Sequence, residues 1–219
     1  MQPSQLVVIG AGLTAFAVSV VVWPVVHVLI TLAHEGGHAM AVSLMGGSVK
    51  SLNALRPRGG VTTFTGLGPL GRFVTALAGY VGPSAFGLGG AYLLSRGQVR
   101  TVLWISVVLL LMALFAAGSY YTRFAIIAIG AVIVMVIRKA SDGQEAFFAY
   151  TWIWFLLFGG FIHVLAFQSL RRAGPDKSSD AYVLRQLTFL PASLWSGLFW
   201  LASLTAVVYG GGILLGYYH

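Results

Sequence analysis

The sequence contains no cysteine, which excludes a disulfide framework, a thiolate metal site and a cysteine nucleophile. Charged residues are scarce, at 8% of the 219 residues, whereas soluble domains carry about 25%. Only 5 residues are acidic, against 13 lysines and arginines, so an acid inside an apolar segment needs a functional reason. No polar segment is long enough to form a separate soluble domain beside the apolar ones.

What the chain has in excess is apolar residues, which make up 58% of it at a mean hydropathy of +0.88. This composition predicts an all-α polytopic membrane protein, a single integral-membrane domain over 1–219 with about six transmembrane helices. We expect a break at Pro24, which divides the first apolar region, and a short or interfacial helix over 124–137. The apolar stretches are 6–22, 24–45, 73–94, 101–117, 124–137, 147–167 and 191–218.

Residues 47–66 have a different pattern, with two short runs of β-branched residues on either side of Arg56-Pro-Arg-Gly-Gly60. This pattern predicts a small β-hairpin directly after a helix over 24–46. An exposed strand of the hairpin could pair with an extended substrate segment, or the hairpin could simply close the inner mouth of the protein. The sequence favours neither role over the other.

The net charge of +8 comes from basic residues in the short loops, which is typical of membrane anchors and does not indicate nucleic-acid binding. If the N-terminus lies outside, nine basic residues are inside and four outside, so the positive-inside rule favours this orientation. The inside residues are Lys50, Arg56, Arg58, Arg72, Arg123, Arg171, Arg172, Lys177 and Arg185, and the outside residues are Arg96, Arg100, Arg138 and Lys139.

The segment His34-Glu-Gly-Gly-His38 lies inside the apolar stretch 24–45. At a spacing of four residues, the two imidazoles lie on one face of a helix, one turn apart. Two neutral imidazoles at this spacing bind Zn²⁺, with Glu35 beside them as the general base for zinc-activated water. A five-residue match is a weak signal, but a glutamate within an apolar helix is costly and indicates function.

A catalytic zinc ion generally takes three protein ligands, so a third residue is expected to join His34 and His38. We favour Asp180, which starts a helical pattern at 181–187 and falls in the polar loop 168–190, on the same side of the membrane as the end of the motif helix. The alternatives for the third ligand are Asp176, Asp142 and His163.

Several segments together resemble the site-2 protease family of intramembrane zinc metalloproteases, most closely its short bacterial members without PDZ or CBS domains. The resemblance implies a zinc ion held by two histidines and one aspartate, here His34, His38 and Asp180, with Glu35 as base. The usual family pattern Asn-x-x-Pro…Asp-Gly is absent, since Asp142-Gly143 has no Asn-x-x-Pro before it. The matching segments are Thr31-Leu-Ala-His-Glu-Gly-Gly-His-Ala39, Gly46-Gly47 with the hairpin, Ala78-Gly-Tyr-Val-Gly-Pro83, and Ser179-Asp-Ala181 followed by Thr188, Pro191 and Trp195.

We therefore expect a zinc metallopeptidase that hydrolyses peptide bonds of membrane-spanning or membrane-adjacent substrates. It would be a multi-pass protein of a bacterial cell membrane, in contact with lipid and a membrane protein or peptide substrate, with its active site near the cytoplasmic face. His163 and Asn53 are candidate electrophilic helpers. The alternatives are a non-proteolytic scaffold, transporter or regulator that retains a metal site, and a zinc hydrolase of lipids or small amides. Substrate identity, gating and oligomeric state stay open.

Overall fold

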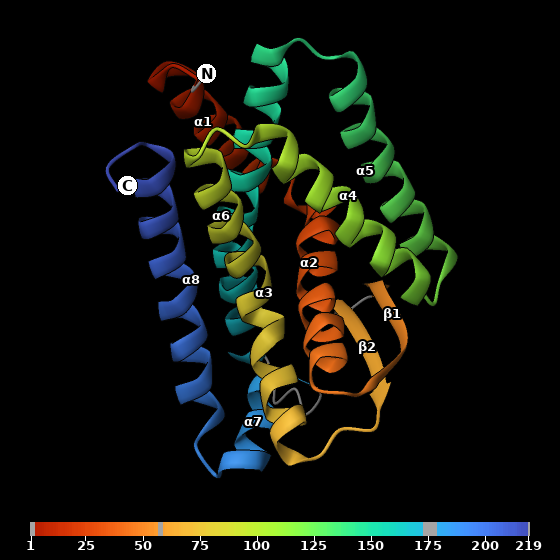
Figure 1. Cartoon of the computed structure of the whole chain (residues 1–219). Coiled ribbons are helices and arrows are strands. Elements are labelled where there is room, and N and C mark those ends of the chain that lie inside the picture. The colour runs from red at the N-terminus through yellow and green to blue at the C-terminus, as the bar shows by residue number, and fades with distance from the viewer. Residues whose placement is uncertain (1–2, 57–58, 173–178, 219) are drawn as a thin grey trace.

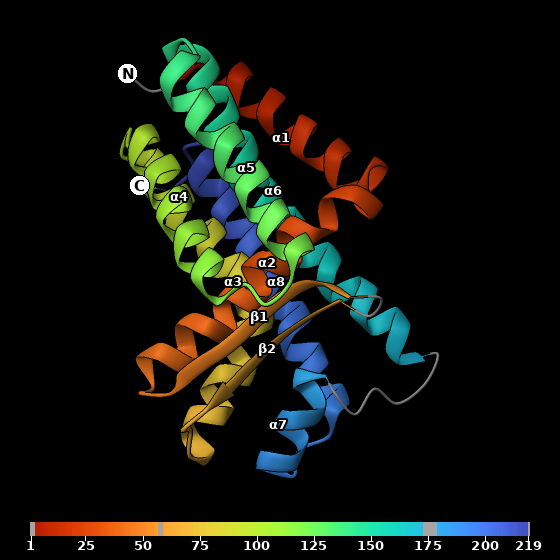
Figure 2. The ribbon, with the colours of Figure 1, turned by 90° about the vertical axis from the view of Figure 1, so that its right-hand side faces the viewer.

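The computed structural model describes residues 3–56, 59–172 and 179–218. This part of the chain forms a bundle of eight helices and one two-stranded antiparallel sheet (Figure 1). Both termini lie at one end of the bundle, and the hairpin and the short helix α7 (Asp180–Thr188) lie toward the other end (Figures 1 and 2). The predicted class, an all-α membrane fold with a small hairpin, is confirmed.

Among the described residues, 5 helices are long and apolar enough to cross a bilayer. Two further helices are apolar in part: α1 (Gln5–Val21), at 17 residues, and α3 (Pro69–Ser95), at 27 residues. The chain is thus a multi-pass membrane protein. The five candidate spans are α2 (Trp23–Leu44), α4 (Val99–Ala116), α5 (Tyr120–Lys139), the segment Asp142–Ala166 of α6 (Asp142–Arg172), and α8 (Ala192–Leu214).

The expected break near Pro24 is present. Helix α1 ends at Val21 and α2 begins at Trp23, with Val22 between them and Pro24 in the first turn of α2. Proline has no N–H to donate and fixes its φ, so it is favoured in the first turn of a helix, where that N–H would have no partner within the helix. Helix α2 ends at Leu44, and Gly46 takes the left-handed φ of 78° that stops it.

The hairpin consists of β1 (Ser48–Arg56) and β2 (Gly59–Thr65), and it lies across α2 (Figure 2). The second edge of β1 is also occupied, because Leu52 forms a parallel bridge with Ala117 in the connection between α4 and α5. Leu52 and Ala54 are buried in a cluster with apolar residues of α2 and α5. Strand β1 therefore has a neighbour at each edge, β2 at one and Ala117 at the other.

Helices α2 and α3 approach each other through small residues. A Cβ at Gly37 would overlap the carbonyl of Ala78 and lie 3.2 Å from the Cα of Gly82, so only glycine allows this contact. Helix α3 also packs against α6, α7 and α8, which makes it the central helix of the bundle. The close contact places the His34 and His38 face of α2 against α3.

Two predicted segments differ in the structure. The expected short helix over 124–137 is longer, since Ser119 caps α5 by accepting a hydrogen bond from the Thr122 N–H, and the helix runs over 20 residues. The loop predicted over 168–190 is helical at both ends, because α6 continues to Arg172 and α7 begins at Asp180. Asp176 lies outside the described residues.

Candidate metal centre

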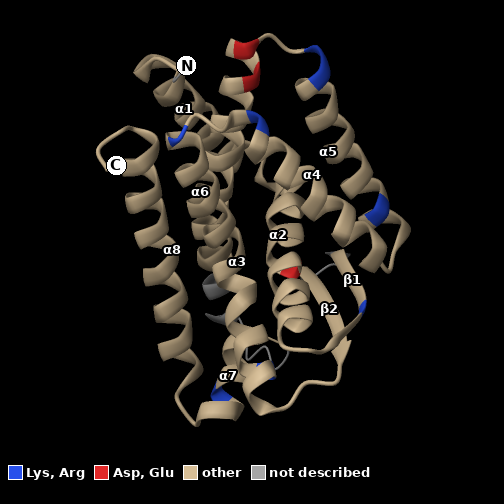
Figure 3. Ribbon diagram, in the orientation of Figure 1, with Lys and Arg blue, Asp and Glu red and all other residues tan. Residues whose placement is uncertain are grey.

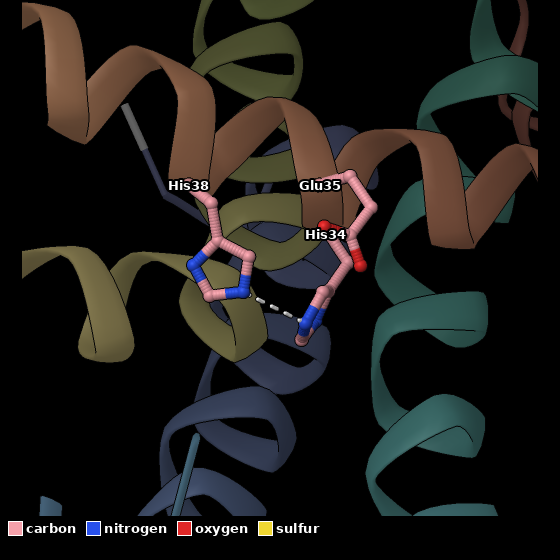
Figure 4. A group of neighbouring side chains, drawn as sticks. All are labelled: His34, Glu35 and His38. Carbon is pink, nitrogen blue, oxygen red and sulfur yellow. Dashed lines mark hydrogen bonds between the residues drawn. The ribbon is translucent and has the colours of Figure 1, made fainter. Parts of the chain in front are cut away.

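His34, Glu35 and His38 meet on the second half of α2, where one ligand atom from each lies within 4.8 Å of the others (Figure 4). All three are buried, with exposed fractions of 7%, 3% and 8%. The Nε2 atoms of the two histidines are 3.2 Å apart. Two imidazoles and a carboxylate are ligands that divalent transition metals accept, so this cluster has the chemistry to hold a metal ion.

A second carboxylate reaches the same two histidines from α7. Asp180 Oδ2 lies 3.3 Å from Nε2 of His34 and 3.3 Å from Nε2 of His38. Ligand atoms around a tetrahedral zinc ion, with bonds of about 2.0–2.1 Å, are about 3.3–3.4 Å apart. The triangle formed by the two nitrogens and this oxygen therefore matches one face of such a coordination shell.

The position of Asp180 follows from the way α7 is anchored. Ser179 caps the helix by accepting a hydrogen bond from the Tyr182 N–H, which fixes Asp180 as the first helical residue. Ala181 and Leu184 are fully buried in a cluster with residues of α3, α6 and α8. Burial by itself would raise the pKa of the Asp180 carboxyl, but the adjacent imidazoles outweigh it and hold that pKa below its usual range, so the group stays ionised.

The outer contacts of the two histidines differ. The Nδ1 of His38 hydrogen-bonds to the main-chain carbonyl of Thr75 on α3 at 2.7 Å. In a neutral ring with its proton on Nδ1, the lone pair of Nε2 faces His34 and Asp180 and is free to bind a metal ion. None of the described residues forms a hydrogen bond with Nδ1 of His34. The sequence did not single out this carbonyl, because any residue at position 75 would supply it.

Gly79 on α3 is a further part of the centre. A Cβ there would lie 2.8 Å from Oδ2 of Asp180 and would overlap the ring of His38. The absence of a side chain at Gly79 therefore makes room for His38 and Asp180. Gly79 belongs to the segment Ala78–Pro83 that carries part of the family resemblance, but the sequence assigned it no role.

The Glu35 carboxylate lies beside the two histidines and also contacts the hairpin. Its Oε2 accepts a hydrogen bond of 2.7 Å from the hydroxyl of Thr62 on β2. Among the described residues, no lysine or arginine nitrogen lies within 4.0 Å of the Glu35 carboxylate. Thr62 was missed at the sequence level, since a threonine in a predicted strand indicates only β-structure.

The other sequence candidates lie in different places. His163 on α6 is close, with its ring centroid 5.2 Å from that of His34. Asp142 is at the opposite end of the same helix, 21 positions before His163 and therefore about 30 Å along the axis. The Asn53 amide lies beside Gly118, in the connection between α4 and α5. Of the carboxylates considered as third ligand, the structure thus places Asp180 with the histidines and Asp142 far from them.

Searches among curated proteins and among solved structures find no match to this chain. A family comparison does find one, and it extends over residues 6–210, which include every residue of the candidate centre. The matched family is described as Peptidase M50B-like, in agreement with the resemblance seen in the sequence. The chain belongs to the Peptidase M50B-like family, a site-2 protease family.

Proposed function

We propose that the protein is an intramembrane zinc metallopeptidase, in which His34, His38 and Asp180 hold the ion and Glu35 is the general base. The observation that carries the proposal is the triangle of two imidazole nitrogens and one carboxylate oxygen, with sides of 3.2, 3.3 and 3.3 Å. Its dimensions fit zinc coordination, and the family supplies the expectation of a peptidase.

The division of roles between the two carboxylates follows from their contacts. Asp180 lies against both histidines, whereas Glu35 lies next to them with a hydroxyl as its hydrogen-bond donor. A bound zinc ion supplies Lewis-acid activation of a water molecule and of the scissile carbonyl. Glu35 accepts the proton of the attacking water and returns it to the leaving amine. His163, beside His34, is a candidate to stabilise the oxygen on which negative charge develops.

The substrates we propose are membrane-spanning or membrane-adjacent peptides, because the centre is built on a helix that itself can cross the bilayer. The active site would face the cytoplasm of a bacterial cell. Lys50, Arg72 and Arg185 lie at the end of the bundle that holds the hairpin and α7, and the acidic residues of α6 lie at the opposite end (Figure 3). Four of the 13 basic residues, Arg96, Arg100, Arg138 and Lys139, lie with those acidic residues at the opposite end, and the other nine belong to segments assigned to the inside, so the count supports this orientation.

The test uses wild-type and Glu35→Gln protein purified in detergent, with metal content measured by mass spectrometry. Cleavage is followed with a panel of fluorescein-labelled single-span peptides in micelles. We expect about one zinc ion per chain in both proteins. Cleavage by the variant should be reduced about 10²- to 10⁴-fold, because the general base is lost.

Wild-type protein without bound zinc would contradict the metal assignment. Zinc-loaded wild type that cleaves no peptide of the panel would contradict the peptidase. Unchanged cleavage by Glu35→Gln would contradict the role of Glu35.

A further inference from the structure

The hairpin contacts both oxygens of the Glu35 carboxylate. On one side, the Thr62 hydroxyl donates to Oε2 at 2.7 Å and lies 3.2 Å from the main-chain oxygen of the same glutamate. On the other side, a Cβ at Gly60 would overlap Oε1 and lie 2.6 Å from Cδ. Residues 60 and 62 are two positions apart, so both face α2 from the same side of β2.

The two glycines at the hairpin turn are present for different reasons. Gly59 takes a φ of 106°, in the left-handed region, with open space around its Cα, so the turn requires it. Gly60 does not adopt such a φ, yet it has no room for a Cβ, because the Glu35 side chain fills that space. The sequence of β2 is therefore fitted to Glu35 and not only to the turn.

The hydroxyl is also held in place relative to α2. The strand paired with β2 is anchored by the Gly118 N–H, which donates to the Leu52 carbonyl at 2.9 Å, and by the Ala54 N–H, which donates to the Thr122 hydroxyl at 3.1 Å. Leu52 is fully buried against α2 and α5. The Thr62 hydroxyl, on the strand paired with this anchored one, therefore restricts the orientation of the Glu35 carboxylate.

From these contacts we propose that Thr62 is a positioning residue for the general base, an inference that rests on the proposed function of Glu35. Its hydroxyl holds the carboxylate in one orientation beside the metal centre. A hydrogen bond of 2.7 Å from a hydroxyl on an anchored hairpin limits the orientations that the carboxylate can adopt. Gly60 completes the arrangement by leaving the space that the carboxylate occupies. The hairpin thus takes part in catalysis through Glu35.

The experiment compares Thr62→Val, which keeps the shape but removes the hydroxyl, with Thr62→Ser, which keeps the hydroxyl. Thr63→Val is the matched control, because the Thr63 hydroxyl forms a bond of the same 2.7 Å length with Ser51 on the exposed face. We expect kcat of Thr62→Val toward the labelled peptides to fall about 10- to 100-fold, as for outer contacts of catalytic groups. KM and zinc content should stay within about twofold, with most of the activity present in Thr62→Ser and all of it in Thr63→Val.

A readout that needs no cleavage is the thermal midpoint of the metal-free protein in detergent. Thr62→Val should lower it by about 2–6 °C in the wild-type background and by clearly less in a Glu35→Ala background, where only the 3.2 Å contact with the main-chain oxygen of residue 35 remains. Equal kcat in Thr62→Val and wild type would overturn the inference while leaving the peptidase intact. If wild type cleaves nothing, the peptidase fails, and equal shifts in both backgrounds would then overturn the Thr62 contact as well.

Discussion

The bundle contains two buried glutamates, one beside the candidate metal centre and one at the end where the termini lie, and the two are satisfied in different ways. Glu145, in the first turn of α6, is 2% exposed, and both its oxygens accept from Nε of Arg100 at 3.0 and 3.1 Å. Glu35, 3% exposed, accepts instead from the neutral hydroxyl of Thr62. Glu145 is thus held in an ion pair, whereas the hydrogen bond that Glu35 accepts comes from an uncharged group.

The comparison shows that burial of an acid in a membrane helix does not by itself indicate catalysis. The groups that surround the acid distinguish a structural role from a catalytic one. Glu145 joins α6 to the start of α4 at the end where the chain termini lie, which is a structural task. Glu35 lies beside two histidines and Asp180, where a metal ion and a water molecule would meet it. Three further predictions test the difference between the metal centre and the opposite end.

The largest effect is expected from replacing Asp180, at the metal centre, by alanine, with Asp142 at the opposite end as the control. Asp180→Ala should lower zinc affinity more than about 100-fold and abolish cleavage, because it removes an oxygen that lies 3.3 Å from both histidine nitrogens. Asp142→Ala, at the fully exposed Asp142, should bind zinc and cleave like wild type. Isothermal titration calorimetry with Zn²⁺ measures the zinc affinity of both variants, and the peptide assay measures their cleavage. The reverse result would place the metal centre at Asp142.

A smaller effect is expected from filling the space at Gly79. Gly79→Ala places a Cβ against the ring of His38 and 2.8 Å from Oδ2 of Asp180, so zinc affinity should fall about 10- to 100-fold. Gly89→Ala is the control on the same helix, because a Cβ there meets nothing within 4 Å. Equal zinc affinity of the two variants would contradict the prediction that a Cβ at position 79 displaces His38 and Asp180.

The smallest effect concerns stability and sharpens the difference between the glutamates. Glu145→Gln should lower the free energy of unfolding by about 1–3 kcal/mol, because it weakens a charged hydrogen-bonded pair. Arg100 is 64% exposed and can be solvated, which limits the loss. Zinc content and kcat should be those of wild type. A loss of cleavage with normal stability would give Glu145 a catalytic role and remove the distinction.

Local pattern accounts for the parts of the fold that the sequence predicted correctly. The apolar stretches, the break before Pro24 and the hairpin around Arg56–Gly60 each depend on a few neighbouring residues, whose preferences were not overridden by packing. The helix over 124–137 was predicted too short because Tyr120 and Tyr121 were assigned to the loop. The Ser119 cap, which extends α5 backward, becomes visible only when the backbone is seen.

The candidate site divides in the same way. The spacing of His34 and His38 fixes their common face on any helix, so the sequence by itself determined that these two imidazoles lie together. It also determined the membrane setting, because apolar helices with so few charged residues (8%) are stable in a bilayer and not in water. The tertiary structure alone decided that Asp180 meets both histidines, that Gly79 leaves room for them, and that Thr62 holds Glu35. These contacts join segments far apart in the chain, and they depend on how α2, α3, α7 and the hairpin pack, which no local spacing encodes.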